Sequence, residues 1–173
     1  MYNIVGAMFA AESEAREAMA ALAETPKING TTIFQMTLMK RKNGELKVCD
    51  NFTSEHLTSN DTVKGGLIGG LIGILGGPLG VLLGGATGAL VGNAVDADDK
   101  IDSKTLIAQA AQKLEEGDMA LIMMVDETDE AILDHMLVKY NTVIIRYDAD
   151  TIAKEVEAAE KRAKELAEQQ KEA

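Results

Sequence analysis

Few side chains in this sequence have the types and spacing that catalysis or metal binding requires. The two histidines, His56 and His135, have no second histidine or cysteine nearby, whereas a zinc site needs three or four convergent ligands. Asp134 precedes His135, but adjacent positions on a helix do not face each other, which argues against an acid–base pair. The lone Cys49 falls in a predicted strand, where a free thiol usually fills core space. We therefore predict no catalytic residue, no metal site and no cofactor.

Two further segments could bind ligands in principle, and neither has the pattern that binding requires. The acidic stretch DADDKID at residues 96–102 lacks the glycine turn and the terminal glutamate of an EF-hand loop, so we interpret it as a solvated linker. The glycine-rich stretch at residues 65–92 contains neither GxxxxGK[ST] nor GxGxxG. A phosphate-binding loop is therefore not predicted.

The glycine-rich stretch instead has the spacing of a helix-packing element. It reads GGLIGGLIGILGGPLGVLLGGATGALVG and holds 12 of the 16 glycines, and no charged residue lies between Gly65 and Val95. Glycines at steps of four form ridges without side chains on a helix, which lets another backbone approach closely. The predicted helix-packing and oligomerisation residues are Gly65, Gly69, Gly73, Gly76, Gly80, Gly84, Gly88 and Gly92. Pro78 breaks the series, so we predict two helices, roughly 62–75 and 78–95, which we call the glycine-zipper hairpin.

The same segment raises the question of a membrane. As one helix, residues 65–95 exceed the roughly 20 apolar residues that span a bilayer, but the two arms of a hairpin are too short for two full crossings. Two environments remain open: insertion into a lipid membrane through residues 65–95, and burial between protein surfaces. The absence of tryptophan in the chain removes part of the usual interfacial belt and disfavours the membrane.

Composition limits the partners. The net charge of −11 repels nucleic acid, so no nucleic-acid partner is predicted. The first residues lack the basic region of a signal peptide, and we expect a cytoplasmic protein or one at the cytoplasmic face of the membrane.

Periodicity predicts the remaining elements. Residues 3–9 and 119–125 have the doubly apolar pattern of buried strands, and Asn43-Gly44 is a hairpin turn between two further strands. Without the hairpin, the order is β-α-β-β-α-β followed by one α-β pair. The predicted elements are strands 3–9, 31–41, 45–52, 119–125 and 142–147 and helices 12–24, 103–116, 129–139 and 150 onward.

We predict an α+β protein with a ferredoxin-like (βαββαβ) sheet, an inserted glycine-zipper hairpin and a C-terminal helix. Helices 12–24 and 103–116 would cover one face of the sheet and leave the other face open for oligomerisation or binding. The last helix has a heptad-like seam, which suits either docking on its own domain or an intersubunit coil. The predicted parts are residues 1–60 and 97–148 of the ferredoxin-like domain, the hairpin at 61–96, and the charged helix at 149–173.

This order of elements, with GGLIGGLIGILGGPLGVLLGGATGALVG between the third strand and the second helix, resembles the bacterial and archaeal DUF1269 family over most of residues 1–150. The resemblance implies an uncharacterised protein, of a kind often labelled a membrane protein, and carries no enzymatic activity. Two functions are expected. The first is non-enzymatic self-assembly into a homo-oligomer through the hairpin, and the alternative is a regulatory module that binds a small molecule, which rests on fold analogy.

Overall fold

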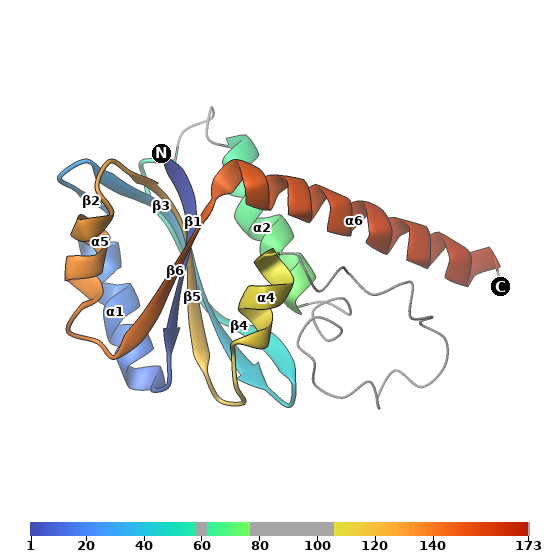
Figure 1. The fold of residues 1–173 in the computed structure, drawn as a ribbon, viewed down its shortest axis with the longest axis horizontal. Helices are drawn as coiled ribbons and strands as arrows, with labels where there is room; N and C mark the ends of the chain where they lie inside the picture. Colours follow the sequence, from blue (N-terminus) through green and yellow to red (C-terminus); the bar gives the residue numbers. More distant parts are fainter. Residues whose placement is uncertain (58–61, 77–105, 173) are drawn as a thin grey trace.

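The chain forms a mixed α+β structure around a six-stranded antiparallel sheet (Figure 1). The structure is a computed structural model that describes residues 1–57, 62–76 and 106–172. The strands are β1 (Tyr2–Phe9), β2 (Lys27–Ile28), β3 (Thr31–Lys42), β4 (Glu45–Thr53), β5 (Met119–Glu127) and β6 (Thr142–Asp148). The helices are α1 (Glu12–Glu24), α2 (Thr62–Gly76), α4 (Leu106–Gln112), α5 (Glu130–Leu137) and α6 (Ala149–Glu172).

The strand order of the sheet is β2-β3-β5-β1-β6, and β4 also pairs with β3. Because β5 occupies one edge of β3, β2 and β4 follow each other along its other edge. The inner strands are β3, β5 and β1, and two of them, β1 and β5, are the segments predicted to be apolar on both faces. All five predicted strands are confirmed, and the short β2 was not predicted.

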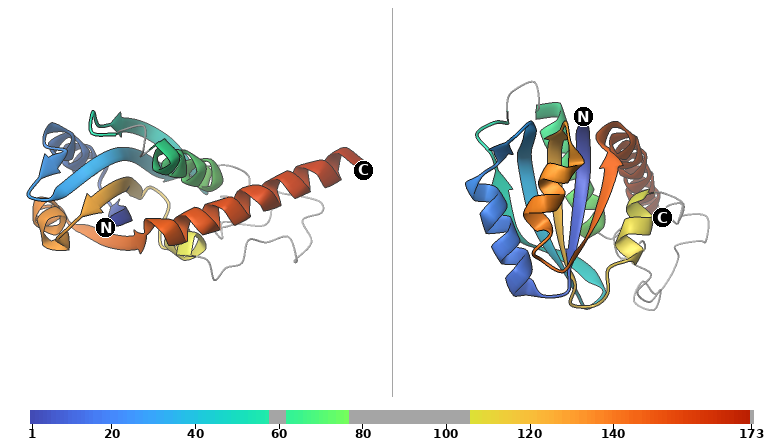
Figure 2. Two further views of the ribbon diagram at one scale, coloured as in Figure 1. Left: turned by 90° about the horizontal axis from the view of Figure 1, so that it is seen from above. Right: turned by 60° about the vertical axis from the view of Figure 1, so that its left-hand side comes forward.

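Two hydrophobic cores lie on opposite faces of the sheet. Side chains of α1 and α5, among them Leu22 and Leu133, pack on one face with Met123 of β5. Side chains of α2 and α6, among them Leu71 and Ile152, pack on the other face with Met124 of β5. Figures 1 and 2 show α1 and α5 together on one side and α2, α4 and α6 on the other.

This arrangement corrects the predicted assignment of helices to faces. The helix expected at 103–116 ends at Gln112 and does not join α1. Its helical part among the described residues, α4, packs near α6, and α5 lies beside α1 instead. The face expected to be open is covered by α2, α4 and α6. The reason is that the doubly apolar strands β1 and β5 bury side chains on both of their faces, so both faces need a covering layer.

The start of α6 docks on its own domain. Ile152, Val156 and Ala159 of the predicted seam are buried in the same core as α2, and the later turns of α6 extend away from the sheet (Figure 2). The docked part of the seam therefore packs within one subunit.

Candidate functional site

The apolar residues of α2 attach this helix to the sheet. Its leucines and isoleucines recur at steps of three and four, which places them on one side of the helix. Five of these six side chains are at most 7% exposed and pack in one core with β3, β4, β5 and α6, while Ile72 is partly buried. The five are Leu67, Ile68, Leu71, Ile74 and Leu75. The position of α2 is thus set by its buried side, which leaves its glycines to define the rest of its surface.

Three glycines form a bare outer face on α2. Gly66, Gly69 and Gly73 are exposed, and a Cβ atom added at any of them would meet no described heavy atom within 4 Å. Their spacing of three and four residues places them on one side of the helix. We call these three residues the glycine face.

Two other glycines of α2 allow close contacts inside the subunit. A Cβ atom at Gly70 would lie 2.8 Å from Cγ1 of Val156 and 3.0 Å from Oε1 of Glu160, so the missing side chain lets α6 approach. A Cβ atom at Gly76 would lie 3.2 Å from the backbone oxygen of Leu46 in β4. Gly70 and Gly76 are therefore packing positions within the fold.

Of the eight glycines predicted as packing residues, four lie in α2 and four lie outside the described residues. Gly65, Gly69, Gly73 and Gly76 lie in α2, which matches the first predicted arm at 62–75. The second arm at 78–95 lies outside the described residues, as do the remaining predicted glycines, namely Gly80, Gly84, Gly88 and Gly92. Gly66 and Gly70 were missed because the prediction took one glycine from each pair, although the Gly66–Gly70 step of four was visible in the sequence.

A surface hollow borders the glycine face. It has a volume of about 250 Å³ and lies between α2 and the hairpin of β3 and β4, with Gly69 and Ile72 on one side and Asn51 on the other. Oε1 of Gln35, another residue of its lining, is buried and has no hydrogen-bond partner among the described residues. The surface beside Gly69 thus combines apolar groups with groups that can form hydrogen bonds.

The remaining candidate residues do not converge. His56 follows β4, Cys49 lies on β4 and His135 lies on α5. Within the described ranges, no three side chains of histidine, cysteine, aspartate or glutamate group as metal ligands would. The acidic stretch at 96–102 lies outside the described residues.

Asp134 pairs with an arginine. Nη2 of Arg146 donates to Oδ1 of Asp134 at 2.6 Å, and Nε of Arg146 donates to Oε2 of the buried Glu127 at 3.0 Å. Burial raises the pKa of Glu127, which the contact with Arg146 partly offsets. Burial by itself lowers the pKa of Arg146, but the hydrogen bonds to Asp134 and Glu127 outweigh it and the pKa is raised. These residues join α5 to β5 and β6.

The chain is thus an α+β protein that carries a glycine-rich apolar helix on one face of an antiparallel sheet. A model of the family described as "Protein of unknown function (DUF1269)" matches residues 62–163, more than half of the chain, and the chain belongs to this family. The matched range begins at α2 and ends within α6, so it includes the glycine-rich stretch and leaves out β1 to β4. No curated protein and no solved structure matches the chain.

The structure also bears on membrane crossing. Among the helices of residues 1–57, 62–76 and 106–172, none has both the length and the hydropathy that a membrane span requires.

Proposed function

We propose that this chain is a non-enzymatic protein that self-assembles into a homo-oligomer, with the glycine face of α2 as a contact surface. The observation that supports the proposal is the open space beside Gly66, Gly69 and Gly73. Each glycine in a helix interior costs about 0.8–1 kcal/mol relative to alanine. No described part of the subunit uses these three positions for a close approach, so a second backbone on the glycine face would offset that cost.

We favour a second copy of this chain over lipid as the partner of the glycine face, because of how α2 is packed. Its apolar side chains are already packed on the sheet, and the surface left over is a row of glycines beside a hollow that contains Asn51 and Gln35. A lipid surface would gain little apolar area from glycines, whereas a helix gains close van der Waals contact and hydrogen-bonding partners.

For the fold, we propose that β1, α1, β3, β5, α5 and β6 form a ferredoxin-like unit. In support, the order of these four strands is β3-β5-β1-β6, and both helices lie on the same face. In this proposal, β4 and the glycine-zipper hairpin are an insertion between β3 and β5.

The proposal is tested by measuring the molar mass of the intact chain without detergent, by light scattering after size exclusion. We expect the wild type to have at least twice the 18.4 kDa mass of one chain. Gly69→Leu should reduce that mass, because the leucine side chain would keep a second backbone away. The fold itself should persist in this variant, since the space beside Gly69 is open.

The matched control is Ala158→Leu, which adds the same kind of side chain at an exposed position of α6 away from the glycine face. It should leave the mass unchanged. A monomeric wild type, or a Gly69→Leu variant with wild-type mass, would show that the glycine face does not drive assembly. Recovery of the wild type only in the membrane pellet, released by detergent and not by salt, would favour lipid contact instead.

A further inference from the structure

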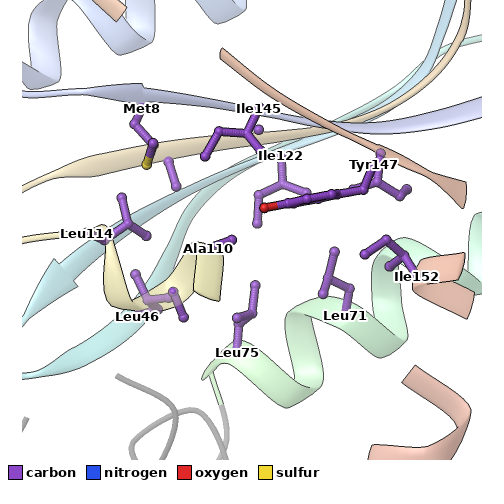
Figure 3. A pocket seen from close by; sticks show the side chains of 14 residues that line it. Met8, Leu46, Leu71, Leu75, Ala110, Leu114, Ile122, Ile145, Tyr147 and Ile152 are labelled. Atoms are coloured by element: carbon purple, nitrogen blue, oxygen red, sulfur yellow. The ribbon is translucent and has the colours of Figure 1, made fainter. Parts of the chain in front are cut away.

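An apolar cavity lies between the sheet and the helices that cover its second face (Figure 3). Its volume is about 70 Å³. Its walls include Leu71 and Leu75 of α2, Ala110 beside them on α4, and Ile122, Ile145 and Ile152 from β5, β6 and α6. The cavity opens partly to the surface, since Ile145 and Tyr147 in its lining are only half-buried. Protein interiors are normally packed as densely as organic crystals, so an unfilled space of this size beside a core requires a reason.

Gly6 is the origin of the space on the side of the sheet. It lies on β1 between Ile122 of β5 and Ile145 of β6, and a Cβ atom added to it would meet nothing described within 4 Å. Gly6 does not share the positive φ of Gly30, Gly44 and Gly117, so its backbone conformation is open to other residues. Glycine weakens the interior of a strand, and the backbone conformation at position 6 does not require a glycine. We therefore attribute the open cavity to the missing side chain of Gly6.

Tyr147 supplies a hydrogen-bonding group within this apolar lining. Figure 3 shows its ring across the cavity with the hydroxyl oxygen pointing inward, toward Ile122 and Ala110. Burial and then the negative charge of Glu155 raise the pKa of Tyr147, so the hydroxyl is neutral at ordinary pH. The nearby carboxylate of Glu155 also disfavours an anionic ligand.

The size and lining of the cavity define the class of ligand. A water molecule occupies roughly 10–15 Å³ on this scale of volume, so the cavity corresponds to about five to seven heavy atoms. Water itself is a poor occupant, because an ordered water needs two to four polar partners and the lining is almost entirely carbon.

We propose that this cavity is a binding site for a small, neutral, mainly apolar molecule of about five to seven heavy atoms, whose polar group meets the Tyr147 hydroxyl. Small-molecule binding was the alternative function expected from the sequence. This proposal assigns it to a specific place in the fold and to a class of ligand. The site is independent of self-assembly, since it uses the buried side of α2 and the glycine face lies on the outer side.

The test is a titration of the intact chain with phenol and with toluene, which have nearly the same shape and differ in that phenol carries a hydroxyl where toluene carries a methyl group. The signals of ¹³C-labelled isoleucine methyl groups of Ile122, Ile145 and Ile152 report binding in the cavity. We expect both probes to shift these signals. Tyr147→Phe should weaken the binding of phenol by about tenfold, which corresponds to the loss of one hydrogen bond, and leave the affinity for toluene unchanged.

Gly6→Val fills the cavity from the strand and should abolish the binding of both probes without lowering the melting temperature. Pentanoate, an anion matched to 1-hexanol in heavy-atom count, should bind more weakly than the alcohol. The proposal is overturned if neither phenol nor toluene shifts the signals, if Gly6→Val still binds them, or if pentanoate binds as tightly as 1-hexanol. The mass of the oligomer, measured in parallel, shows whether a failure concerns the cavity or the assembly.

Discussion

The carboxylate of Glu116, in the segment before β5, forms hydrogen bonds with the tip of the β3–β4 hairpin. The turn residues Asn43 and Gly44 both have positive φ, which is the conformation that an Asn-Gly turn supplies. The side chain of Glu116 accepts hydrogen bonds from both of their backbone N–H groups, and at Gly44 the distance is 3.1 Å. These bonds lower the pKa of Glu116, because they favour its ionised form.

This contact predicts a pH dependence of stability. A lowered pKa in the folded state stabilises the fold above the unfolded pKa of about 4.5, and this contribution is lost as the pH falls through the folded value. Glu116→Gln should therefore be less stable than the wild type at neutral pH and lose less stability on acidification. Thermal unfolding between about pH 3 and pH 7 measures the difference.

The neighbouring exposed residue provides the control for this experiment. Glu115→Gln removes the same charge one position away and should leave the wild-type slope in place. If Glu116→Gln loses stability below pH 4.5 as steeply as the wild type, the hydrogen bonds to the turn are not the cause of the slope.

At the scale of elements, the packing of α2 against α6 depends on one glycine of a pair. Gly69→Ala should raise the free energy of unfolding by about 0.8–1 kcal/mol, since it removes a helix-interior glycine at an open position. Gly70→Ala should be less stable than Gly69→Ala by about 1–3 kcal/mol, because its Cβ would overlap with Val156.

Denaturant titration at a protein concentration low enough to dissociate any oligomer compares the two alanine variants. Equal stabilities would mean that α6 can shift without cost, and the close approach at Gly70 would then have no structural role. A Gly70→Ala, Val156→Ala double variant should recover part of the loss, because it removes the overlapping methyl groups.

The elements themselves were predictable, whereas their assignment to faces was not. The alternation of apolar residues gives the type and limits of a strand or a helix, as at Asn43-Gly44 and at the doubly apolar segment of β5. It does not say which helix covers which face. The amphipathic patterns of α4 and α5 suit either side, and the choice depends on packing between parts of the chain that are far apart in the sequence, as in the core that holds both Leu22 and Leu133.

One feature of the sequence does indicate that both faces of the sheet are covered, and the prediction of an open face did not take it into account. A strand that is apolar on both sides, as residues 119–125 are, needs a layer on each face, which is inconsistent with an open sheet. For the candidate site, the four-residue steps selected Gly69 and Gly73, which are bare, but they omitted Gly66 and included Gly76, where an added Cβ would lie 3.2 Å from the backbone oxygen of Leu46. They could not predict that Gly70 contacts Val156 while Gly69 faces open space, because that depends on the direction in which α6 crosses α2.

At the scale of the whole molecule, self-assembly has to overcome electrostatic repulsion. Each copy carries a formal charge of −11, so two copies repel each other over distances of about 10 Å, the Debye length at moderate salt. We expect association to strengthen when the NaCl concentration rises from about 20 to about 300 mM.

Sedimentation equilibrium at both salt concentrations measures this effect. Contact through glycines involves no ion pairs, so screening should act only on the repulsion and shift the equilibrium toward the oligomer. Dissociation at high salt would contradict the prediction and would indicate that ion pairs between subunits hold the assembly.

The position of β5 between β1 and β3 governs when the sheet can form during synthesis. The first strand and the third do not pair with each other; each pairs with β5, so that Tyr2 lies opposite Asp126 and Thr32 also lies opposite Asp126. A nascent chain that has left the ribosome only as far as the glycine-rich stretch has the β3–β4 hairpin but lacks the strand that joins it to β1. Closing the sheet must wait for residues 119–127, and until then the unpaired backbone edges of β1 and β3 are open to chaperones or to other nascent copies.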